Sequence, residues 1–289
     1  MRVLIFLLWL LHWLPLPVLG RFGAAVGSLM FVLIPKRRKI ALANLRLAMP
    51  ELSEKERRDI AHQHFQAYAR SILERSLLWW ASPERLRRLI HLETPVPRAE
   101  MENGPTILLC PHFVCLDVAG VAARVIPVSS IYAPQKSRVF DALLRRGRER
   151  WGPVRLITRS EGIKPVIRAL RDGLPYFMLP DMDFGAKDAA FVPFFGIPAA
   201  TLTALPRLAA ATGAKVIPVI ATFLPNYKGY RVVFYPTWEN YPGTDMLEAT
   251  RRMNAFIEER VREAPAEYFW THKRYKTRPE GEPSPYEDI

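Results

Sequence analysis

The residues in this chain best suited to chemistry are a histidine and an aspartate separated by four residues, His112 and Asp117. They follow an apolar run, residues 106–110, that ends at Pro111 and is typical of a buried β-strand. Strand ends are where α/β folds place catalytic groups. A histidine at such a point can accept a proton from a hydroxyl, and a carboxylate on its other ring nitrogen fixes its tautomer and direction. The pair therefore has the parts of a general base and its orienting residue.

Other kinds of catalytic or metal site find less support in the sequence. Cys110 and Cys115 flank His112, but no second ligand cluster has the spacing of a zinc site, so we expect no metal and two reduced thiols. The chain contains no G-x-S-x-G motif, no Walker A loop and no G-x-G-x-x-G motif. These absences argue against a serine hydrolase and against a nucleotide cofactor, and we expect that no cofactor is required.

Strands and helices alternate from residue 106 onward, which predicts an α/β fold with a mixed, mostly parallel sheet flanked by helices. The expected strands are 106–110, 128–132, 155–158, 176–179, 216–223 and 231–235, and the expected helices are 117–124, 138–151, 162–172, 201–212 and 245–264. The short connection at 225–229 makes the last two strands an antiparallel hairpin. Earlier in the chain, Ser53 and Glu56 form the pattern of a capping box, so a long helix should run from there to about Trp80.

The N-terminus carries two apolar stretches, residues 3–19 and 22–34, followed by four consecutive cations at 36–39. The first stretch is barely long enough to cross a bilayer, and its tryptophans and prolines also suit a segment that lies in the membrane interface. No clear cleavage site for a signal peptide is present. We therefore expect residues 1–35 to be a membrane anchor, crossing or embedded, and residues 36–289 to be a single α/β domain in the cytoplasm. A buried helical hairpin of a soluble protein is the alternative.

The chain is strongly basic, with 41 Lys and Arg against 28 Asp and Glu and a net charge of +13. This balance implies acidic partners such as nucleic acid, anionic lipid or an acidic carrier protein. The basic residues are spread over several expected elements and the chain begins with a membrane segment, so we expect no nucleic acid partner. The arginine-rich helix at 138–151 is either a solvated face or, beside a catalytic strand end, a holder of phosphate groups.

A second strand end carries Asp181 and Asp183, and residues 191–201 follow with a dense run of aromatic, proline and glycine residues. The two carboxylates contact substrate or brace the sheet, and the apolar run is either a buried loop or the side of a groove for an acyl chain. From these stretches we take as candidate substrate-binding residues Lys136, Arg138, Arg145, Arg159, Asp181, Asp183 and Phe194.

Taken together, these stretches resemble the lauroyl and myristoyl acyltransferases of bacterial lipid A biosynthesis, within the lysophospholipid acyltransferase-like superfamily. Beside the His112–Asp117 motif, the resemblance is carried by 36–41 with Asn44 and Leu45, Leu52-Ser53 with Glu56-Arg57, Glu74, Trp79-Trp80, 143–148, L-P-D-x-D-x-G at 179–185, F-V-P-F-F-G at 191–196 with Pro198, Ala199 and Thr201, and Trp270, His272, Lys273, Arg274, Arg278 and Pro279. The likeness covers nearly the whole chain. So many matches in order are far more specific than the histidine–aspartate spacing alone.

The resemblance implies an enzyme of the bacterial inner membrane whose catalytic domain faces the cytoplasm. Such enzymes move a fatty acyl chain from acyl carrier protein to a hydroxyl of a lipid A precursor, an anionic glycolipid acceptor. In the family's motif His112 is the general base and Asp117 orients it. An activated hydroxyl attacks a thioester without a cofactor, and backbone amides near the start of the helix after Asp117 are candidate donors to the oxyanion.

One departure from the family pattern concerns the acceptor. Many relatives have Tyr-Arg-Pro where this chain has Tyr132-Ala133-Pro134, so a cation is missing that Lys136 or Arg138 would replace. Two other interpretations stay open. One is a glycerophospholipid or lysophospholipid acyltransferase with the same histidine–aspartate chemistry, and the other is a non-catalytic protein that binds membrane surfaces.

Overall fold

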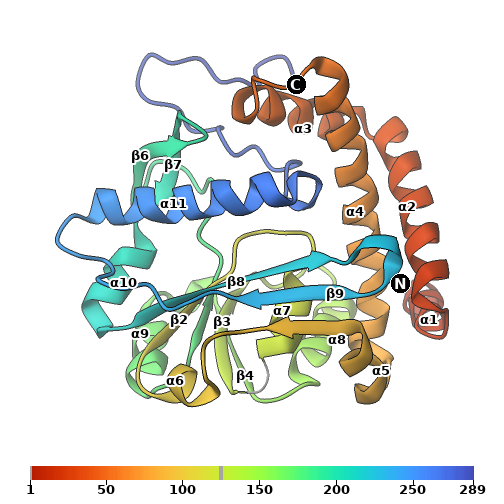
Figure 1. The fold of residues 1–289 in the computed structure, drawn as a ribbon, viewed down its shortest axis with the longest axis horizontal. Helices are drawn as coiled ribbons and strands as arrows, with labels where there is room; N and C mark the ends of the chain where they lie inside the picture. The colour runs from red at the N-terminus through yellow and green to blue at the C-terminus, as the bar shows by residue number, and fades with distance from the viewer. Residues whose placement is uncertain (1, 124–125) are drawn as a thin grey trace.

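A mixed sheet of seven strands forms the centre of the structure, a computed structural model that describes residues 2–123 and 126–289 (Figure 1). The strand order is β1-β9-β8-β2-β5-β3-β4, and among these described strands only β1 and β9 run opposite to the others. The strands are β1 (Ile90–Glu93), β2 (Thr106–Leu109), β3 (Val128–Tyr132), β4 (Val154–Thr158), β5 (Tyr176–Met178), β8 (Lys215–Phe223) and β9 (Tyr230–Phe234). The predicted α/β class and the antiparallel β8–β9 hairpin are confirmed.

Helices cover both faces of the sheet because its central strands are apolar on both sides. In β2, Ile107 and Leu109 face one core and Leu108 faces the other. The first core is closed by α9 (Lys164–Arg171), α10 (Ala204–Thr212) and α11 (Met246–Glu263), and the second by α5 (Pro83–Leu89), α6 (Arg98–Glu102), α7 (Leu116–Ala122) and α8 (Arg138–Glu149). The carboxyl ends of β2, β5, β3 and β4 meet at one edge, where open α/β sheets bind their ligands.

The aromatic and proline-rich stretch forms a separate antiparallel hairpin of β6 (Ala189–Phe194) and β7 (Ile197–Leu202). Phe195 and Gly196 have positive φ angles of 52° and 74°, as a tight hairpin turn requires. The hairpin packs on α11, where Nδ2 of Asn254 donates to the Pro193 carbonyl at 2.9 Å. The sequence pattern predicts no strand here because Pro193 and Pro198, which stand opposite each other in the hairpin, interrupt it.

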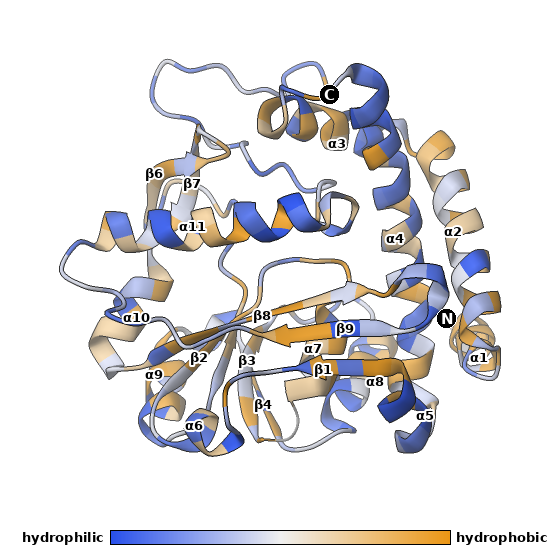
Figure 2. Cartoon of the chain, viewed as in Figure 1, coloured by the Kyte–Doolittle hydropathy of each residue, from blue (hydrophilic) through white to orange (hydrophobic). Residues whose placement is uncertain are grey.

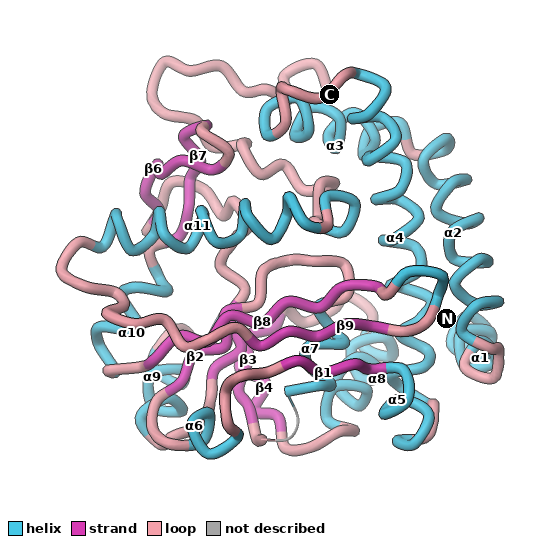
Figure 3. The backbone as a smooth tube through the Cα atoms, viewed as in Figure 1, coloured by secondary structure: helices cyan, strands magenta, loops and turns pink. Residues whose placement is uncertain are grey.

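A long helix, α4 (Glu54–Trp80), connects the N-terminal part of the chain to the sheet and begins with the predicted capping box of Ser53 and Glu56. α2 (Leu16–Leu33) lies along α4, and α3 (Pro35–Ala48) packs near the start of α4 (Figure 3). Glycines of α2 allow this close approach, since a Cβ on Gly27 would lie 2.4 Å from the Cα of Gln66. α2 is therefore fitted to α4 along one face.

The apolar N-terminus consists of two helices, so no continuous span covers residues 3–19. The first, α1 (Arg2–Leu11), has 10 residues and is about 15 Å long, half of the ~30 Å needed to cross a bilayer. Among the described residues, α2 is the one helix long and apolar enough to cross a membrane by length and composition. Figure 2 shows α1 and most of α2 coloured toward the hydrophobic end. α2 is therefore the candidate membrane anchor.

Candidate active site

His112 lies just beyond the carboxyl end of β2, directly after Pro111, as the sequence predicts. Its side chain is 21% exposed and lines a cavity. Its backbone carbonyl accepts a hydrogen bond from the Phe269 N–H at 3.1 Å, and the two rings lie nearly parallel with centroids 6.5 Å apart. The imidazole is therefore held against one wall while it stays accessible from the cavity.

The carboxylate that orients His112 is Asp181. Its Oδ1 lies 2.7 Å from Nδ1 of His112, and its Oδ2 accepts the His112 backbone N–H at 2.9 Å. β5 pairs in parallel with β2, so the residues after the two strands meet at the same edge. Burial of Asp181 raises its pKa, but the charge and hydrogen bonds of His112 outweigh this and hold the pKa below its ordinary value. The ionised carboxylate only accepts, which leaves the proton on Nδ1 and a lone pair on Nε2.

Asp117 takes a different position from the one that its spacing predicts. It lies in the first turn of α7, and its carboxylate contacts Nε of Arg75 at 2.6 Å and Nη2 of Arg148 at 3.9 Å. The helical turn directs its side chain toward α4 and α8, which carry these arginines. The prediction that Asp117 occupies the other ring nitrogen of His112 is therefore corrected, since Asp181 occupies it.

A cavity of about 650 Å³ opens beside His112. It lies where the sheet splits: β3 pairs with β5 only as far as Ser130 opposite Phe177, whereas β3 pairs with β4 as far as Tyr132 opposite Thr158. Most of the described lining residues are aliphatic or aromatic, and the charged residues among them, beside His112, are Arg75, Asp117, Arg148 and Arg159. A cavity of this size and character suits a ligand with a long apolar part and a polar head.

Among the predicted substrate-binding cations, Arg159 lines this cavity, and its guanidinium lies over an aromatic ring of the lining. Arg145 does not line the cavity, but its Nη1 contacts the hydroxyl of Tyr132, which does, at 3.3 Å. Lys136 and Arg138 are exposed and do not belong to the lining. The structure thus brings one of the four cations, Arg159, to the cavity lining and leaves the other three exposed outside it.

The other predicted substrate contacts, Asp181, Asp183 and Phe194, are engaged within the protein. Asp183 accepts hydrogen bonds from the backbone N–H and the hydroxyl of Thr277, at 2.7 and 2.8 Å. Phe194 is fully buried in the first core against aromatic rings of the C-terminal part. Asp181 holds His112. None of the three side chains lines the cavity.

The C-terminal segment, residues 265–278, holds both loops of the site. The Val114 N–H donates to the Glu267 carbonyl at 2.8 Å, and the Asp183 N–H donates to Nε2 of His272 at 3.1 Å. Nδ2 of Asn44, on α3, ties the segment to the N-terminal helices by donating to the carbonyls of Trp270 and His272 at 2.6 and 2.7 Å. The resemblance to the family marks Asn44, Asp183, Trp270 and His272 in the sequence, but no spacing indicates their contacts.

Backbone amides around the start of α7 are already used within the protein. Those of Val114, Leu116 and Val118 donate to main-chain carbonyls at 2.8, 3.0 and 2.8 Å. These three are therefore not the oxyanion donors that the sequence suggests. Arg75 and Arg148 line the cavity and bring positive charge beside His112 instead. Arg75 has no sequence signal of its own, because its place depends on how α4 packs against α7.

The two cysteines are buried free thiols of the second core, and burial raises the pKa of Cys110 and Cys115. Thiols in such apolar surroundings are poor nucleophiles. In the described part of the chain, no group of three or more His, Cys, Asp or Glu side chains is arranged to hold a metal ion.

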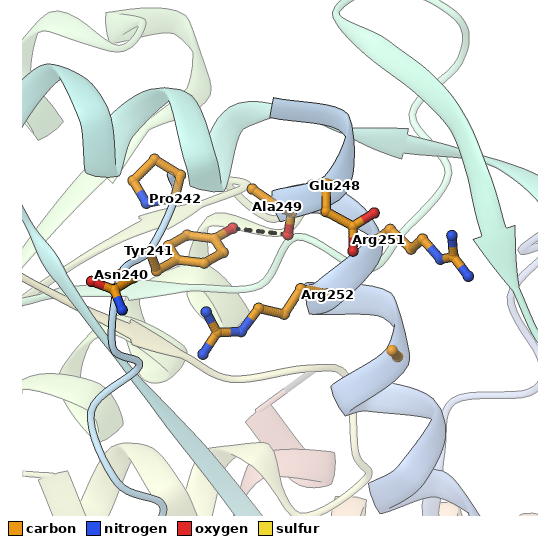
Figure 4. A pocket seen from close by; sticks show the side chains of 8 residues that line it. Asn240, Tyr241, Pro242, Glu248, Ala249, Arg251 and Arg252 are labelled. Atoms are coloured by element: carbon orange, nitrogen blue, oxygen red, sulfur yellow. Dashed lines mark hydrogen bonds between the residues drawn. The ribbon is translucent and has the colours of Figure 1, made fainter. Parts of the chain in front are cut away.

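A second concavity, of about 500 Å³, lies between the turn at 240–242 and the start of α11 (Figure 4). The Tyr241 hydroxyl donates to the Ala249 carbonyl at 3.3 Å, and the Arg252 guanidinium lies over the rings of Trp238 and Tyr241. None of the described residues that line it also lines the cavity of His112. Its polar groups thus serve the packing of α11.

The fold should lose stability as the pH falls from about 6.5 to about 4. Burial lowers the pKa of His64 and of His272 to about 4 from the ordinary 6.5. Between these values the unfolded chain binds two protons that the folded chain does not, so acid favours unfolding. Glu267 opposes this effect, because burial raises its pKa from 4.5 to about 7 and the folded chain then holds one extra proton. Each histidine therefore contributes a fall of roughly 1.4 kcal/mol per pH unit, which Glu267 and two further carboxyl groups whose pKa burial raises, Glu74 and Glu258, partly offset.

Urea unfolding in detergent at about pH 7.5 and about pH 5 measures this dependence. His64→Gln keeps a donor for the Ala266 carbonyl, which Nδ1 of His64 contacts at 3.1 Å, and removes one titrating group, so the acid loss should shrink. Glu267→Gln is the matched control and should make the loss steeper. The assignment is contradicted if His64→Gln leaves the pH dependence unchanged.

Known proteins that are similar to this chain in sequence belong to one family. The sequence profile of the bacterial lipid A biosynthesis acyltransferases matches residues 2–277. The lipid A biosynthesis palmitoleoyltransferase and lauroyltransferase of Escherichia coli (strain K12) are 32% and 33% identical to this chain, each alignment covering 96% of this chain and 92% of the relative. The myristoyltransferase of the same strain is 31% identical over 93% of this chain and 83% of the relative.

Among solved structures, the 1-acyl-sn-glycerophosphate acyltransferase PlsC of Thermotoga maritima matches with a TM-score of 0.41 and 11% identity, covering 84% of this chain and 98% of that chain. The family profile and the curated relatives span nearly the whole chain, and they confirm the resemblance carried by the sequence motifs. This chain therefore belongs to the bacterial lipid A biosynthesis acyltransferase family.

Proposed function

We propose that this protein moves a fatty acyl chain from the thioester of acyl carrier protein to a hydroxyl of a lipid A precursor. The observation that carries the proposal is the His112–Asp181 pair beside a largely apolar cavity of about 650 Å³. A general base next to such a cavity suits a donor whose chain is bound while its carbonyl meets the base. The names of the relatives, lipid A palmitoleoyl-, lauroyl- and myristoyltransferases, support the acceptor class.

In the proposed reaction His112 moves a single proton between the two substrates. Its Nε2 takes the proton of the acceptor hydroxyl as the oxygen attacks the carbonyl carbon of the thioester. The carbon–sulfur bond then breaks, the carbonyl re-forms as an ester, and the imidazolium returns the proton to the departing thiolate. Asp181 stays ionised throughout and stabilises the imidazolium through Nδ1.

Asp117 acts on the substrate through two arginines in this proposal. It holds Arg75 and Arg148 at the cavity wall, and the three groups together carry one net positive charge beside His112. Positive charge there stabilises the oxyanion that develops on the thioester carbonyl and attracts phosphate groups of donor or acceptor. The net charge of +13 also favours the approach of an acidic carrier protein.

Because of Ala133, a second class of acceptor should also be tested. This residue lines the cavity and brings no cation to the place where the family pattern of the resemblance has arginine. Arg159 comes directly after β4, the strand next to β3. Among the described lining residues it is the cation at this neighbouring strand end. A lysophospholipid acceptor, which makes the protein a glycerophospholipid acyltransferase, is therefore the alternative.

The deciding experiment incubates detergent-solubilised protein with acyl carrier protein thioesters and a lipid A precursor, and follows the product by mass spectrometry. We expect the precursor to gain the mass of one acyl chain as the thioester is consumed. A lysophospholipid in a parallel reaction is the comparison. Transfer to the lysophospholipid alone would replace the proposed acceptor, and no thioester consumption with either would remove the proposal of an enzyme.

We also propose that the protein is bound to the cytoplasmic face of the inner membrane with α2 in the interface. One face of α2 is packed on α4, where a Cβ on Gly23 would lie 2.8 Å from the Cα of Arg70, which is paired with Glu74. If α2 crossed the bilayer, α4 would bring this ion pair to the depth of the hydrocarbon, where ionisable side chains are unfavourable. The outward face exposes Phe22, Leu29 and Val32 by 50, 57 and 63%, a stripe suited to shallow insertion.

Replacing Phe22, Leu29 and Val32 together with serine should release the protein from membranes into the soluble fraction. Each of these side chains contributes roughly 1.5–3 kcal/mol when it is fully buried in an apolar phase. Ultracentrifugation of cell membranes followed by immunoblotting measures the partition.

The matched control replaces Leu92, Val139 and Leu247 with serine. These apolar side chains are 45, 48 and 56% exposed but lie outside α1 and α2. The control should stay with the membrane. Release of both triple variants, or of neither, argues against attachment through the outward face of α2.

A further inference from the structure

The cavity beside His112 extends along both faces of the split sheet. One part, the α7 arm, runs between the sheet and the helices α7 and α8. Its lining includes Leu116, Gly120, Val128, Leu144, Val154 and Phe177. The other part, the α10 arm, lies on the opposite face. Its lining includes Ile131, Tyr176, Met178, Leu202, Ala204 and Leu208.

The α7 arm begins at the catalytic histidine and runs the length of β3. Leu116 and Gly120, four residues apart, lie on the same face of α7, and both line the cavity with His112, which precedes the helix. Val128, at the other end of the α7 arm, is the first residue of β3. The carboxyl end of β3 lies four residues further, which is about 13 Å at 3.3 Å per residue. A thioester carbonyl at His112 would therefore have its chain directed along this face of α7.

Gly120 is unusual among the helical glycines of the described chain. A Cβ on Gly147 of α8 would lie 2.3 Å from the Trp79 ring, and those on the α2 glycines would meet Tyr227 or α4, so close packing requires glycine there. A Cβ on Gly120 meets no atom of the described residues within 4 Å. Its backbone is helical, where glycine is less favourable than alanine, so neither packing against the described residues nor backbone conformation accounts for it.

We propose that the α7 arm holds the acyl chain being transferred and that the open space at Gly120 sets the length of chain accepted. The inference rests on the proposed acyl transfer and adds the residue that determines its chain-length specificity. A side chain at position 120 occupies the path of the chain beyond Leu116. Variants with a larger residue there should prefer shorter chains.

The effect of Gly120→Met should be a change in preference rather than a uniform loss. Each methylene that no longer fits an apolar pocket changes the specificity constant by about 10–200-fold. We therefore expect kcat/KM for the chain preferred by the unmodified protein to fall by at least ~10-fold, and the optimum to move to a chain shorter by about two to four carbons. Gly120→Ala should show the same direction with a smaller shift.

The experiment measures kcat/KM for a series of saturated acyl carrier protein thioesters that differ in two-carbon steps, with the lipid A precursor as acceptor. The matched control is Ala204→Met, an enlargement in the α10 arm of the same cavity. We expect it to keep the chain-length optimum of the unmodified protein. Thermal unfolding accompanies each variant, and Gly120→Ala should unfold at or above the temperature of the unmodified protein, since alanine favours the helix.

The outcomes separate this inference from the proposed function. If the unmodified protein transfers chains but Gly120→Met keeps its optimum, the inference is overturned and the function stands. If Ala204→Met shortens the optimum instead, the donor chain lies in the α10 arm and the inference is likewise overturned. If Gly120→Met transfers nothing, Gly120→Ala decides by whether its optimum moves to shorter chains. An unmodified protein that transfers no member of the series removes both proposals.

Discussion

Asp181→Asn is expected to lower kcat for acyl transfer by about 10²–10⁴-fold, with a smaller change in KM. The ionised Asp181 accepts from both Nδ1 and the backbone N–H of His112, at 2.7 and 2.9 Å, and so keeps the lone pair on Nε2. An amide at this position can donate to Nδ1, which favours the wrong tautomer, and it no longer stabilises the imidazolium. Steady-state kinetics with an acyl carrier protein thioester measures the effect, and circular dichroism checks the fold.

Asp117→Asn is the matched control, because it makes the same chemical change at the carboxylate of the H-x4-D motif. Its loss should release Arg75 and Arg148, which it contacts at 2.6 and 3.9 Å, and should raise KM because phosphate groups are bound less well, while kcat falls less than in Asp181→Asn because only part of the oxyanion stabilisation is lost. The two variants therefore separate the orienting carboxylate from the one that positions cations. The reverse result, a collapse of kcat in Asp117→Asn with Asp181→Asn nearly unaffected, would return the orienting role to Asp117.

His112→Ala is expected to lower kcat by a comparable factor, about 10²–10⁴-fold, because the proton acceptor is removed while the cavity remains. The side chain is 21% exposed and faces the cavity, so its removal should leave the fold intact apart from the lost partner of Asp181. His112→Gln retains a hydrogen-bond donor for Asp181 and should be equally inactive, which separates chemistry from stability.

Imidazole added to His112→Ala should restore part of the rate, since the space left by the side chain opens into the cavity. His62→Ala is the control, because His62 contacts the Ser28 hydroxyl at 3.0 Å and does not line the cavity. It should keep the rate of the unmodified protein. A near-normal rate in both His112→Ala and His112→Gln would falsify the proposed mechanism.

Local patterns predicted the elements of the fold well. The strand before His112 is an uninterrupted apolar run, and the long helix after Ser53 begins with a capping box that depends on only four consecutive residues. Such features depend on residues that are close together in the chain, so they can be read directly from the amino-acid sequence. The β6–β7 hairpin was not predicted because prolines break its alternation, and Phe194 consequently seemed available to line a groove.

The partner of His112 illustrates what spacing cannot supply. Asp117 is close in the chain, whereas Asp181 is 69 residues away and reaches the imidazole only because β5 pairs with β2. Asp181 was a candidate substrate contact for its place at a strand end, but the order of the strands decides which strand ends meet. Arg75 joins the site by the packing of α4 on α7, which is also a tertiary property.

The catalytic geometry depends on contacts made by the C-terminal segment, residues 265–278. Cys115 and Glu267, which this segment brings into contact beside the His112 loop, stand 152 residues apart. During synthesis the N-terminal helices emerge first and can reach a membrane before this segment has been translated. A nascent chain at that stage has its apolar helices but lacks the contacts that fix His112 and the loop of Asp183. The contacts that fix His112 and the loop of Asp183 can therefore form only after residues 265–278 have been synthesised.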